Sequence, residues 1–314
     1  MINQHFPSNI LGKDSKPGFL KNARLGVLGG SGLYSIESLE NVKEVDIDTP
    51  YGKPSDSLRI GNLGGMEVVF LARHGRHHTF TPTEIPYRAN IWALRSLNVR
   101  WILSPSAVGS LQEQVRPLDL VVPDQFIDRT HQRPLTFFGE GAVAHVTMAD
   151  PFCPTLSRLV AEEGEQLMPE GRQLHREGTY LAMEGPAFST RAESRLYRSW
   201  GCNVIGMTNH TEARLAREAE IAYSSLSMVT DYDCWHEGFG NVTVDMVIEN
   251  LSINAKLAKD IIKAIARRVS SMRPQSDAHK ALKNSLMTSK EKVSTTTRQK
   301  INLFTEHYWG KFNK

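Results

Sequence analysis

The chain has 314 residues, of which 40% are hydrophobic and 23% charged, and this composition is typical of a globular protein with a sizeable core. Its net charge of +3 is not gathered into a basic stripe, so we expect no nucleic-acid partner, and no apolar run approaches the roughly 18 residues of a membrane span. The three cysteines, Cys153, Cys202 and Cys234, are odd in number and widely spaced, which excludes a disulfide framework or zinc motif and favours reduced thiols in the cytoplasm.

Apolar runs and helical spacings alternate along the chain. The expected strands are 24–28, 67–72, 101–103, 118–122, 179–183, 203–207 and 221–229. The expected helices are 87–97, 156–167, 191–200, 211–220 and 244–269, with Thr211 as the cap of the fourth helix. This alternation predicts an α/β fold with one central, mostly parallel β-sheet flanked by helices.

The chain divides into three expected parts. Residues 1–23 are polar and irregular, without the apolar core of a secretory signal, and form an N-terminal tail. Residues 24–272 form a single α/β domain without an internal linker. Residues 273–314 form a C-terminal tail, partly helical or flexible: 301–309 could dock as a helix, although we favour a flexible tail.

Two aspartates follow the buried strand 221–229. Asp231 and Asp233 are spaced i, i+2 at a carboxyl strand end, where ligands bind in open α/β sheets. Carboxylates in a partly dry pocket can have pKa values near neutrality, which suits proton transfer. The alternative is an ordinary Asp-rich turn.

Three further strand ends or turns carry groups that suit an anion. The glycine-rich turn 26–32 includes Ser31, Arg73 and His74 follow the strand 67–72, and the small-residue loop 104–110 follows the strand 101–103. Their convergence favours phosphate as a substrate, since neither a P-loop nor a serine-hydrolase elbow is present.

Two other interpretations of these segments stay open. The turn 26–32 could bind a dinucleotide, with Asp46 or Asp48 as the ribose acid, but Ser35 stands where the third glycine belongs. His74, His77 and His78 could bind a metal, but the pattern lacks further ligands and a structural role is favoured. Phe188 and Met207 are candidate contacts for a flat ring and a sugar, with core filling as the alternative.

Taken together, these segments resemble the purine nucleoside phosphorylase family, trimeric type, and most closely its 5′-methylthioadenosine phosphorylase branch. The matching segments are GVLGGSGLY, DTPYGKPSD, LARHGRHHTFTP, YRANIWAL, VGSL, DQFIDRT, MADPFCP, MEGPAFSTRAES, MTNHTEARLAREAEI and TDYDCWHEG. The resemblance implies a single-domain mixed sheet, a homotrimer or dimer of trimers, and neither metal nor cofactor. It implies reversible phosphorolysis of methylthioadenosine to adenine and 5-methylthioribose 1-phosphate, a step of methionine and purine salvage.

The resemblance also assigns roles to individual positions. The implied phosphate-binding residues are Ser31, Arg73, His74, Ser106, Ala107 and Thr208. The implied substrate-binding residues are Phe188, Met207, Asp231 and Asp233, with Asp231 donating a proton to N7 of the leaving base and Asp233 accepting from the 6-amino group. Ser189 and Val244 would set specificity for adenine and for the methylthio group. Val247 and Ile248 would line the 5′ pocket, closed by His145 of a neighbouring subunit.

One departure from the branch pattern bears on substrate preference. The branch commonly has proline before the glutamate of its T-x-x-P-E segment, whereas this chain has His210-Thr211-Glu212. The alternatives are therefore a broader-specificity purine nucleoside phosphorylase or a methylthioinosine phosphorylase. A dinucleotide-binding module is the alternative from another class, but it leaves Arg73, Asp231 and Asp233 unexplained.

Overall fold

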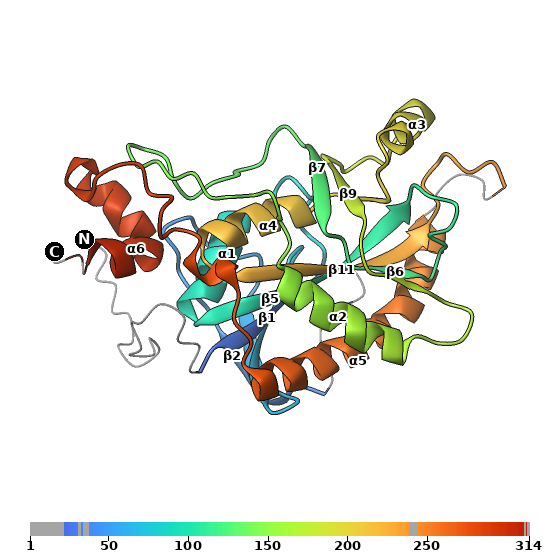
Figure 1. Cartoon of the computed structure of the whole chain (residues 1–314), viewed down its shortest axis with the longest axis horizontal. Helices are drawn as coiled ribbons and strands as arrows, with labels where there is room; N and C mark the ends of the chain where they lie inside the picture. Colours follow the sequence, from blue (N-terminus) through green and yellow to red (C-terminus); the bar gives the residue numbers. More distant parts are fainter. Residues whose placement is uncertain (1–21, 31–32, 34–37, 239–243, 311, 313–314) are drawn as a thin grey trace.

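The computed structural model describes residues 22–30, 33, 38–238, 244–310 and 312 (Figure 1). In this part of the chain, eleven strands form one mixed sheet. The strands are β1 (Arg24–Gly29), β2 (Glu40–Val45), β3 (Leu58–Leu63), β4 (Met66–Ala72), β5 (Val99–Ser110), β6 (Leu120–Val121), β7 (Gln125–Arg129), β8 (Leu174–His175), β9 (Thr179–Met183), β10 (Val204–Gly206) and β11 (Ala222–Asp231). The single α/β domain with a large mixed sheet confirms the predicted fold class.

The long strand β5 organises the sheet. It pairs in parallel with β1 and β11 and antiparallel with β10 near its end. The main path runs β2-β3-β4-β1-β5-β10-β9-β7, while β6 and β8 extend from β11. The parallel strands β4, β1, β5 and β11 therefore form the buried centre, and β2 and β3 form an antiparallel edge.

Helices cover both faces of the sheet, as Figure 1 shows. The helices are α1 (Tyr87–Ser96), α2 (Pro154–Leu167), α3 (Arg191–Ser199), α4 (Asn209–Glu218), α5 (Val244–Met272) and α6 (Thr295–Trp309). Alternate residues of β4 face opposite sides: Val68 and Phe70 join a core cluster with α2 and α5, whereas Val69 and Leu71 join one with α1, α4 and α6. None of the described helices combines the length and apolar character needed to cross a bilayer.

Several expected element boundaries were wrong. The expected loop 104–110 is the second half of β5, because β11 pairs with this strand from Trp101 as far as Gly109. Helix α4 begins at Asn209 with Thr208 in the cap position, so Thr211 lies inside the helix. The sequence analysis also did not identify β2, β3, β7 and β8. Strand β2 is exposed along nearly all its length and therefore carries no apolar run.

The C-terminal segment contains an ordered, docked helix. Ser294 caps α6, and its hydroxyl accepts a hydrogen bond from the Thr297 N–H. Ile301 and Phe304 are buried, and the Phe304 ring lies 4.5 Å from that of Phe137. The structure therefore has a helix at residues 295–309, where we favoured a flexible tail over a docked helix.

Candidate active site

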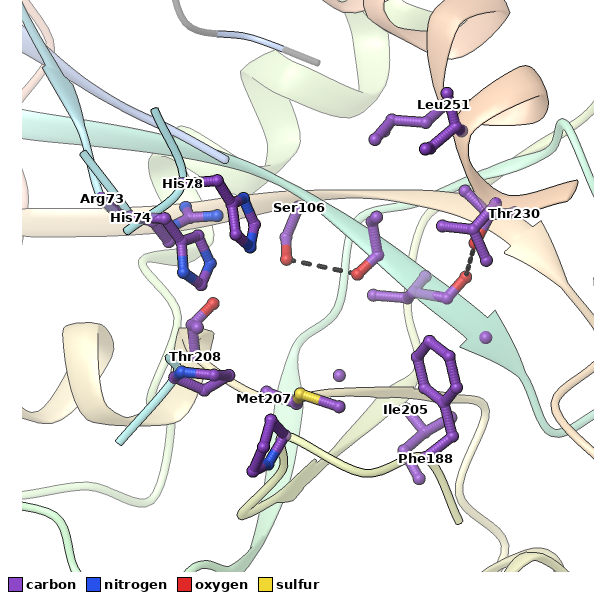
Figure 2. A pocket seen from close by; sticks show the side chains of 18 of the residues that line it. Arg73, His74, His78, Ser106, Phe188, Ile205, Met207, Thr208, Thr230 and Leu251 are labelled. Carbon is purple, nitrogen blue, oxygen red and sulfur yellow. Dashed lines mark hydrogen bonds between the residues drawn. The ribbon is translucent and has the colours of Figure 1, made fainter. Parts of the chain in front are cut away.

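A cavity of about 1080 Å³ opens between the sheet and α5. Its walls come from the residues after β4, the second half of β5, the loop after β9, the ends of β10 and β11, and one face of α5. Strand ends and one long strand thus bring together segments that lie far apart in the sequence. Figure 2 shows these side chains converging, with Arg73, His74 and His78 on one side and Phe188, Ile205 and Thr230 on the other.

One end of the cavity carries cationic and imidazole groups. Arg73, His74 and His78 line this end (Figure 2), and Lys256 and Lys259 of α5 are also among the residues that line the cavity. The His74 and His78 rings stack with centroids 4.4 Å apart. The His74 Nδ1 lies 2.9 Å from the Phe80 carbonyl, which can only accept, so Nδ1 carries the hydrogen. Burial lowers the pKa of His74 to about 4, so the ring is neutral and Nε2 is a hydrogen-bond acceptor.

The Arg73 guanidinium is buried and is held by protein groups. Its Nε donates to Glu212 Oε1 at 2.7 Å, Nη1 donates to the Pro105 carbonyl, and Nη2 donates to the Leu28 carbonyl and the Ser104 hydroxyl. These bonds use four of the five N–H groups of an arginine. The edge of the guanidinium formed by Nε and Nη2 therefore faces Glu212, and one Nη1 hydrogen remains for an anion in the cavity.

The opposite end of the cavity carries two buried carboxyl groups. Asp231 Oδ1 accepts from the Asp233 N–H at 2.8 Å, and its Oδ2 accepts from the Thr230 hydroxyl at 2.7 Å. Asp233 has φ of 51°, a left-handed conformation that Asp tolerates. Gly109 permits this close packing, since a Cβ there would lie 2.9 Å from Asp231 Oδ1.

Burial raises the pKa of both of these carboxyl groups above that of an exposed aspartate. It raises the pKa of Asp231 to about 6, and it raises the pKa of Asp233 against the opposing effect of nearby hydroxyls, including that of Ser189. Asp233 Oδ2 is buried without a hydrogen-bond partner among the described residues. A buried unpaired acceptor of this kind suits a ligand N–H donor.

Small side chains, two of which carry hydroxyl groups, line the cavity between its two ends, together with apolar side chains. Ser106, Ala107 and Thr208 line the middle, and Met207 lies next to Gly185, where a Cβ would approach its sulfur to 2.5 Å. Helix α5 adds Val247, Ile248, Leu251 and Ala255, residues at the i, i+4 spacing of one helix face. These walls would fit a ligand that has a polar end, a flat ring and an apolar substituent.

Most predicted site residues lie in this one cavity. Those in it are Arg73, His74, Ser106, Ala107, Phe188, Met207, Thr208, Asp231, Asp233, Val247 and Ile248. Ser31 and the side chain of Val244 lie outside the described part of the chain. Ser189 is adjacent, with its hydroxyl 3.7 Å from the Met183 sulfur. His145 lies elsewhere, beside a second cavity of about 450 Å³, and its N–H donates to the Ser285 carbonyl.

Other residues of the cavity were not predicted from the sequence. Thr230 lies between the expected strand 221–229 and Asp231, and no role was predicted for it. Leu251 follows Val247, and Lys256 and Lys259 follow Ile248, at helical spacings, a periodicity that could have identified them. Glu212 was noted only as part of a motif, and its contact with Arg73 joins residues 139 positions apart.

The departure from the branch pattern, Thr211 in place of proline, does not reach the cavity walls found in the described residues, because Thr211 is buried inside α4 and is not among the residues that line the cavity. His210 is buried, and its Nε2 lies 3.2 Å from Asp128 Oδ1. The Asn209 amide donates to the hydroxyls of Tyr223 and Ser225. These side chains therefore support the sheet behind the site. Nor do any three described His, Cys, Asp or Glu residues cluster as a metal would require.

Known proteins resemble this chain along most of its length. The pattern of the phosphorylase superfamily matches residues 24–267. An S-methyl-5′-thioadenosine phosphorylase of Prochlorococcus marinus is 84% identical over 314 residues, covering 100% of both chains. One of Thermosynechococcus vestitus is 57% identical, covering 91% of this chain and 99% of its own.

Solved structures show the same likeness. A methylthioadenosine phosphorylase from an antarctic soil metagenomic library superposes with a TM-score of 0.86 at 50% identity, covering 90% of this chain and 99% of its own. A methylthioadenosine phosphorylase from Schistosoma mansoni, solved in complex with adenine, superposes with a TM-score of 0.76 at 35% identity. It covers 79% of this chain and 92% of its own.

Proposed function

The chain belongs to the phosphorylase superfamily, and from that membership we propose that its cavity carries out the reversible phosphorolysis of 5′-methylthioadenosine. The products are adenine and 5-methylthioribose 1-phosphate, so the enzyme is a pentosyltransferase of methionine and purine salvage. The observation that carries the proposal is the division of one cavity into a cationic end and an end with two buried carboxyl groups. Its relatives at high identity are phosphorylases of the same nucleoside.

Phosphate is the group that the cationic end would hold. Arg73 would supply one N–H, and the hydroxyls of Ser106 and Thr208 and the backbone at Ala107 would supply further donors. The neutral His74 ring would accept a hydrogen bond at Nε2 from a protonated phosphate oxygen. Lys256 and Lys259, which also line the cavity, add positive charge that favours binding of an anion. Ser31 remains a proposed ligand on the strength of the family resemblance.

The reaction requires charge stabilisation at both ends of the cavity. Cleavage of the C1′–N9 bond leaves positive charge on the sugar and negative charge on the base. Phosphate stabilises the cationic sugar and then bonds to C1′, while Asp231 gives its proton to N7 of the base. A carboxyl group whose pKa burial raises to about 6 is still partly protonated near neutral pH, as a general acid must be.

The remaining residues would select the substrate. Asp233 Oδ2, buried without a partner among the described residues, would accept from the 6-amino group of adenine. A 6-oxo base would leave this acceptor unpaired and is therefore disfavoured. Phe188 would stack on the purine and Met207 would contact the ribose. Val247 and Ile248, with Val244, would enclose the methylthio group.

We also propose an oligomeric state, a cofactor-free reaction and a cellular compartment for this enzyme. We expect a homotrimer or a dimer of trimers in which His145 of a neighbouring subunit closes the 5′ pocket. Phosphate is a co-substrate, and the reaction needs neither metal nor organic cofactor. Three free cysteines agree with the reducing cytoplasm as its compartment.

The direct test is whether the purified full-length chain releases adenine from methylthioadenosine, with and without phosphate. The proposal predicts release only with phosphate, accompanied by one equivalent of a sugar 1-phosphate detected by ³¹P NMR. Release of free methylthioribose without phosphate would show a hydrolase and contradict the proposal. The absence of adenine under both conditions would also contradict it.

A further inference from the structure

The hydroxyl of Thr230 lies between two acceptors that compete for its single hydrogen. Thr230 Oγ1 is 2.7 Å from Asp231 Oδ2 and 3.2 Å from the carbonyl oxygen of Val108. The residue is 1% exposed and lines the cavity (Figure 2). A hydroxyl has one hydrogen to donate, so the two bonds cannot be made at the same moment. Thr230 therefore has two hydrogen-bonding states and a protein acceptor for each.

The two oxygens of the Asp231 carboxyl group have different neighbours. Oδ1 faces the backbone N–H of Asp233, which can only donate, so this oxygen remains an acceptor in either protonation state. Oδ2 faces a hydroxyl that can turn. A proton on the neutral acid is therefore best placed on Oδ2, with the Thr230 hydrogen turned towards Val108. Once the proton has left, the hydroxyl can turn back and donate to the carboxylate.

The other groups around Asp231 do not provide a hydrogen-bond donor that can turn towards and away from Oδ2. The second half of β5 faces it with Val108 and Gly109, and β10 contributes Ile205 beside Gly109. From α5, the Asn250 amide donates to the Thr230 carbonyl and fixes the end of the strand. The ionisable neighbour is Asp233, whose carboxylate disfavours negative charge on Asp231. Arg73 lies on the side of the cavity away from Thr230 (Figure 2), and Lys256 and Lys259 line the cavity from α5.

We propose that Thr230 is a positioning residue for the acid step, its hydroxyl turning from the Val108 carbonyl to Asp231 Oδ2 as the proton passes to the leaving base. The inference rests on the proposed function, because it concerns the step in which Asp231 protonates N7. The proton moves from Oδ2 to N7, the C1′–N9 bonding pair moves to the base, and Asp231 is left as a carboxylate. Thr230 stabilises that carboxylate as it forms, so its contribution appears in kcat.

The test compares Thr230→Val with Thr230→Ser. Valine keeps the shape and suits a strand but lacks the hydroxyl, whereas serine keeps the hydroxyl. Because a hydrogen bond to a charged group is lost, kcat with methylthioadenosine and phosphate should fall roughly 10- to 100-fold in Thr230→Val and recover in Thr230→Ser. The limb of the pH profile that reports Asp231 should move to higher pH in Thr230→Val, since the carboxylate has lost a donor. A purely structural role would not move that limb.

A double-mutant cycle gives the sharpest outcome. In an Asp231→Asn background, Thr230→Val should cost no further activity, because the group through which it acts is gone. An equal loss of kcat in both backgrounds would overturn the inference, as would normal kcat and an unmoved pH limb in folded Thr230→Val. Failure of the wild-type chain to release adenine with phosphate is a different result, which contradicts the proposed function itself.

Discussion

The Arg73 guanidinium and the Glu212 carboxylate form an ion pair at 2.7 Å in which both side chains are 2% exposed. Glu212 also accepts from the hydroxyls of Ser104 and Tyr223, so the carboxylate ties β4, β5, α4 and β11 together behind the cavity. The pair fixes the plane of the guanidinium and decides which N–H can reach an anion. Positioning of the phosphate site thus depends on a residue that faces away from it.

Removing this carboxylate should affect both stability and phosphate binding. Breaking a buried pair by removing one partner typically costs roughly 3–5 kcal/mol, because the remaining charge is left without compensation. We expect Glu212→Gln to lower the free energy of unfolding by about that amount and to raise the KM for phosphate. Urea denaturation and initial rates measure the two effects. The matched control is Glu67→Gln, whose pair with Arg24 is 3.0 Å long with Glu67 50% exposed; exposed pairs contribute roughly 0–1 kcal/mol.

Replacing the proposed acid should slow turnover strongly and leave the fold intact. In Asp231→Asn the amide can keep both hydrogen bonds, accepting from the Asp233 N–H and donating to the Thr230 hydroxyl. We expect kcat to fall roughly 10²- to 10⁴-fold, the usual contribution of general acid catalysis. Steady-state rates and thermal unfolding measure activity and fold, with Asp260→Asn on the exposed side of α5 as the control. Near-normal rates in folded Asp231→Asn would remove Asp231 from the acid role.

Glu218 should make stability depend on pH. Its carboxyl accepts from the Thr136 hydroxyl and the Phe137 N–H, and burial raises its pKa to about 7. This pKa lies above that of a glutamate in the unfolded chain, so the folded state holds the proton more tightly. The stabilisation that protonated Glu218 gives to the fold is therefore complete below about pH 4 and is lost as pH rises through about 7. Between pH 5 and pH 8 the free energy of unfolding should therefore fall by roughly 2–3 kcal/mol more in the wild type than in Glu218→Gln, which has no carboxyl group at this position. Urea denaturation at both pH values checks this, and identical pH dependence in the two proteins would refute it.

The apolar α5 face should set the preference for a 5′-thioether. Val247 lines the cavity, and an amide there would leave a polar group against the methylthio substituent. Val247→Asn should lower kcat/KM for methylthioadenosine roughly 10- to 100-fold while affecting adenosine much less, as hydrophobic pocket contacts of 1–3 kcal/mol imply. The control is Ile253→Asn on the same helix, where the side chain is 47% exposed. An unchanged ratio between the two substrates in Val247→Asn would show that α5 does not line the 5′ site.

The sequence predicted the buried elements of the fold better than its edges. Apolar runs identified β1, β4, β9 and β11 because these strands are buried on both faces. Strand β2 is held by pairing with β3 at the sheet edge and carries no such run. The segment 104–110 is rich in small residues with weak strand preference, and its pairing with β11 overrides that preference.

The predicted site residues came from strand ends and from family resemblance, and the structure gathers most of them into one cavity. What sequence reasoning could not provide were contacts between distant segments. The bond from Arg73 to Glu212 spans 139 residues. The dual role of the Thr230 hydroxyl depends on Val108, which lies 122 residues earlier. Such relationships follow from strand pairing and helix packing, and no local pattern encodes them.

The central claim is that this cavity selects a 6-amino, 5′-thio nucleoside for phosphorolysis. It is tested most directly by measuring kcat/KM for methylthioadenosine and methylthioinosine side by side at saturating phosphate. The two substrates differ at the purine 6-position, which Asp233 is proposed to contact, and in the N1 hydrogen that accompanies the 6-oxo group. The account predicts a preference for methylthioadenosine of roughly 10⁴-fold or more, because the 6-oxo base leaves a buried acceptor unpaired. Equal values, or a preference for methylthioinosine, would contradict it.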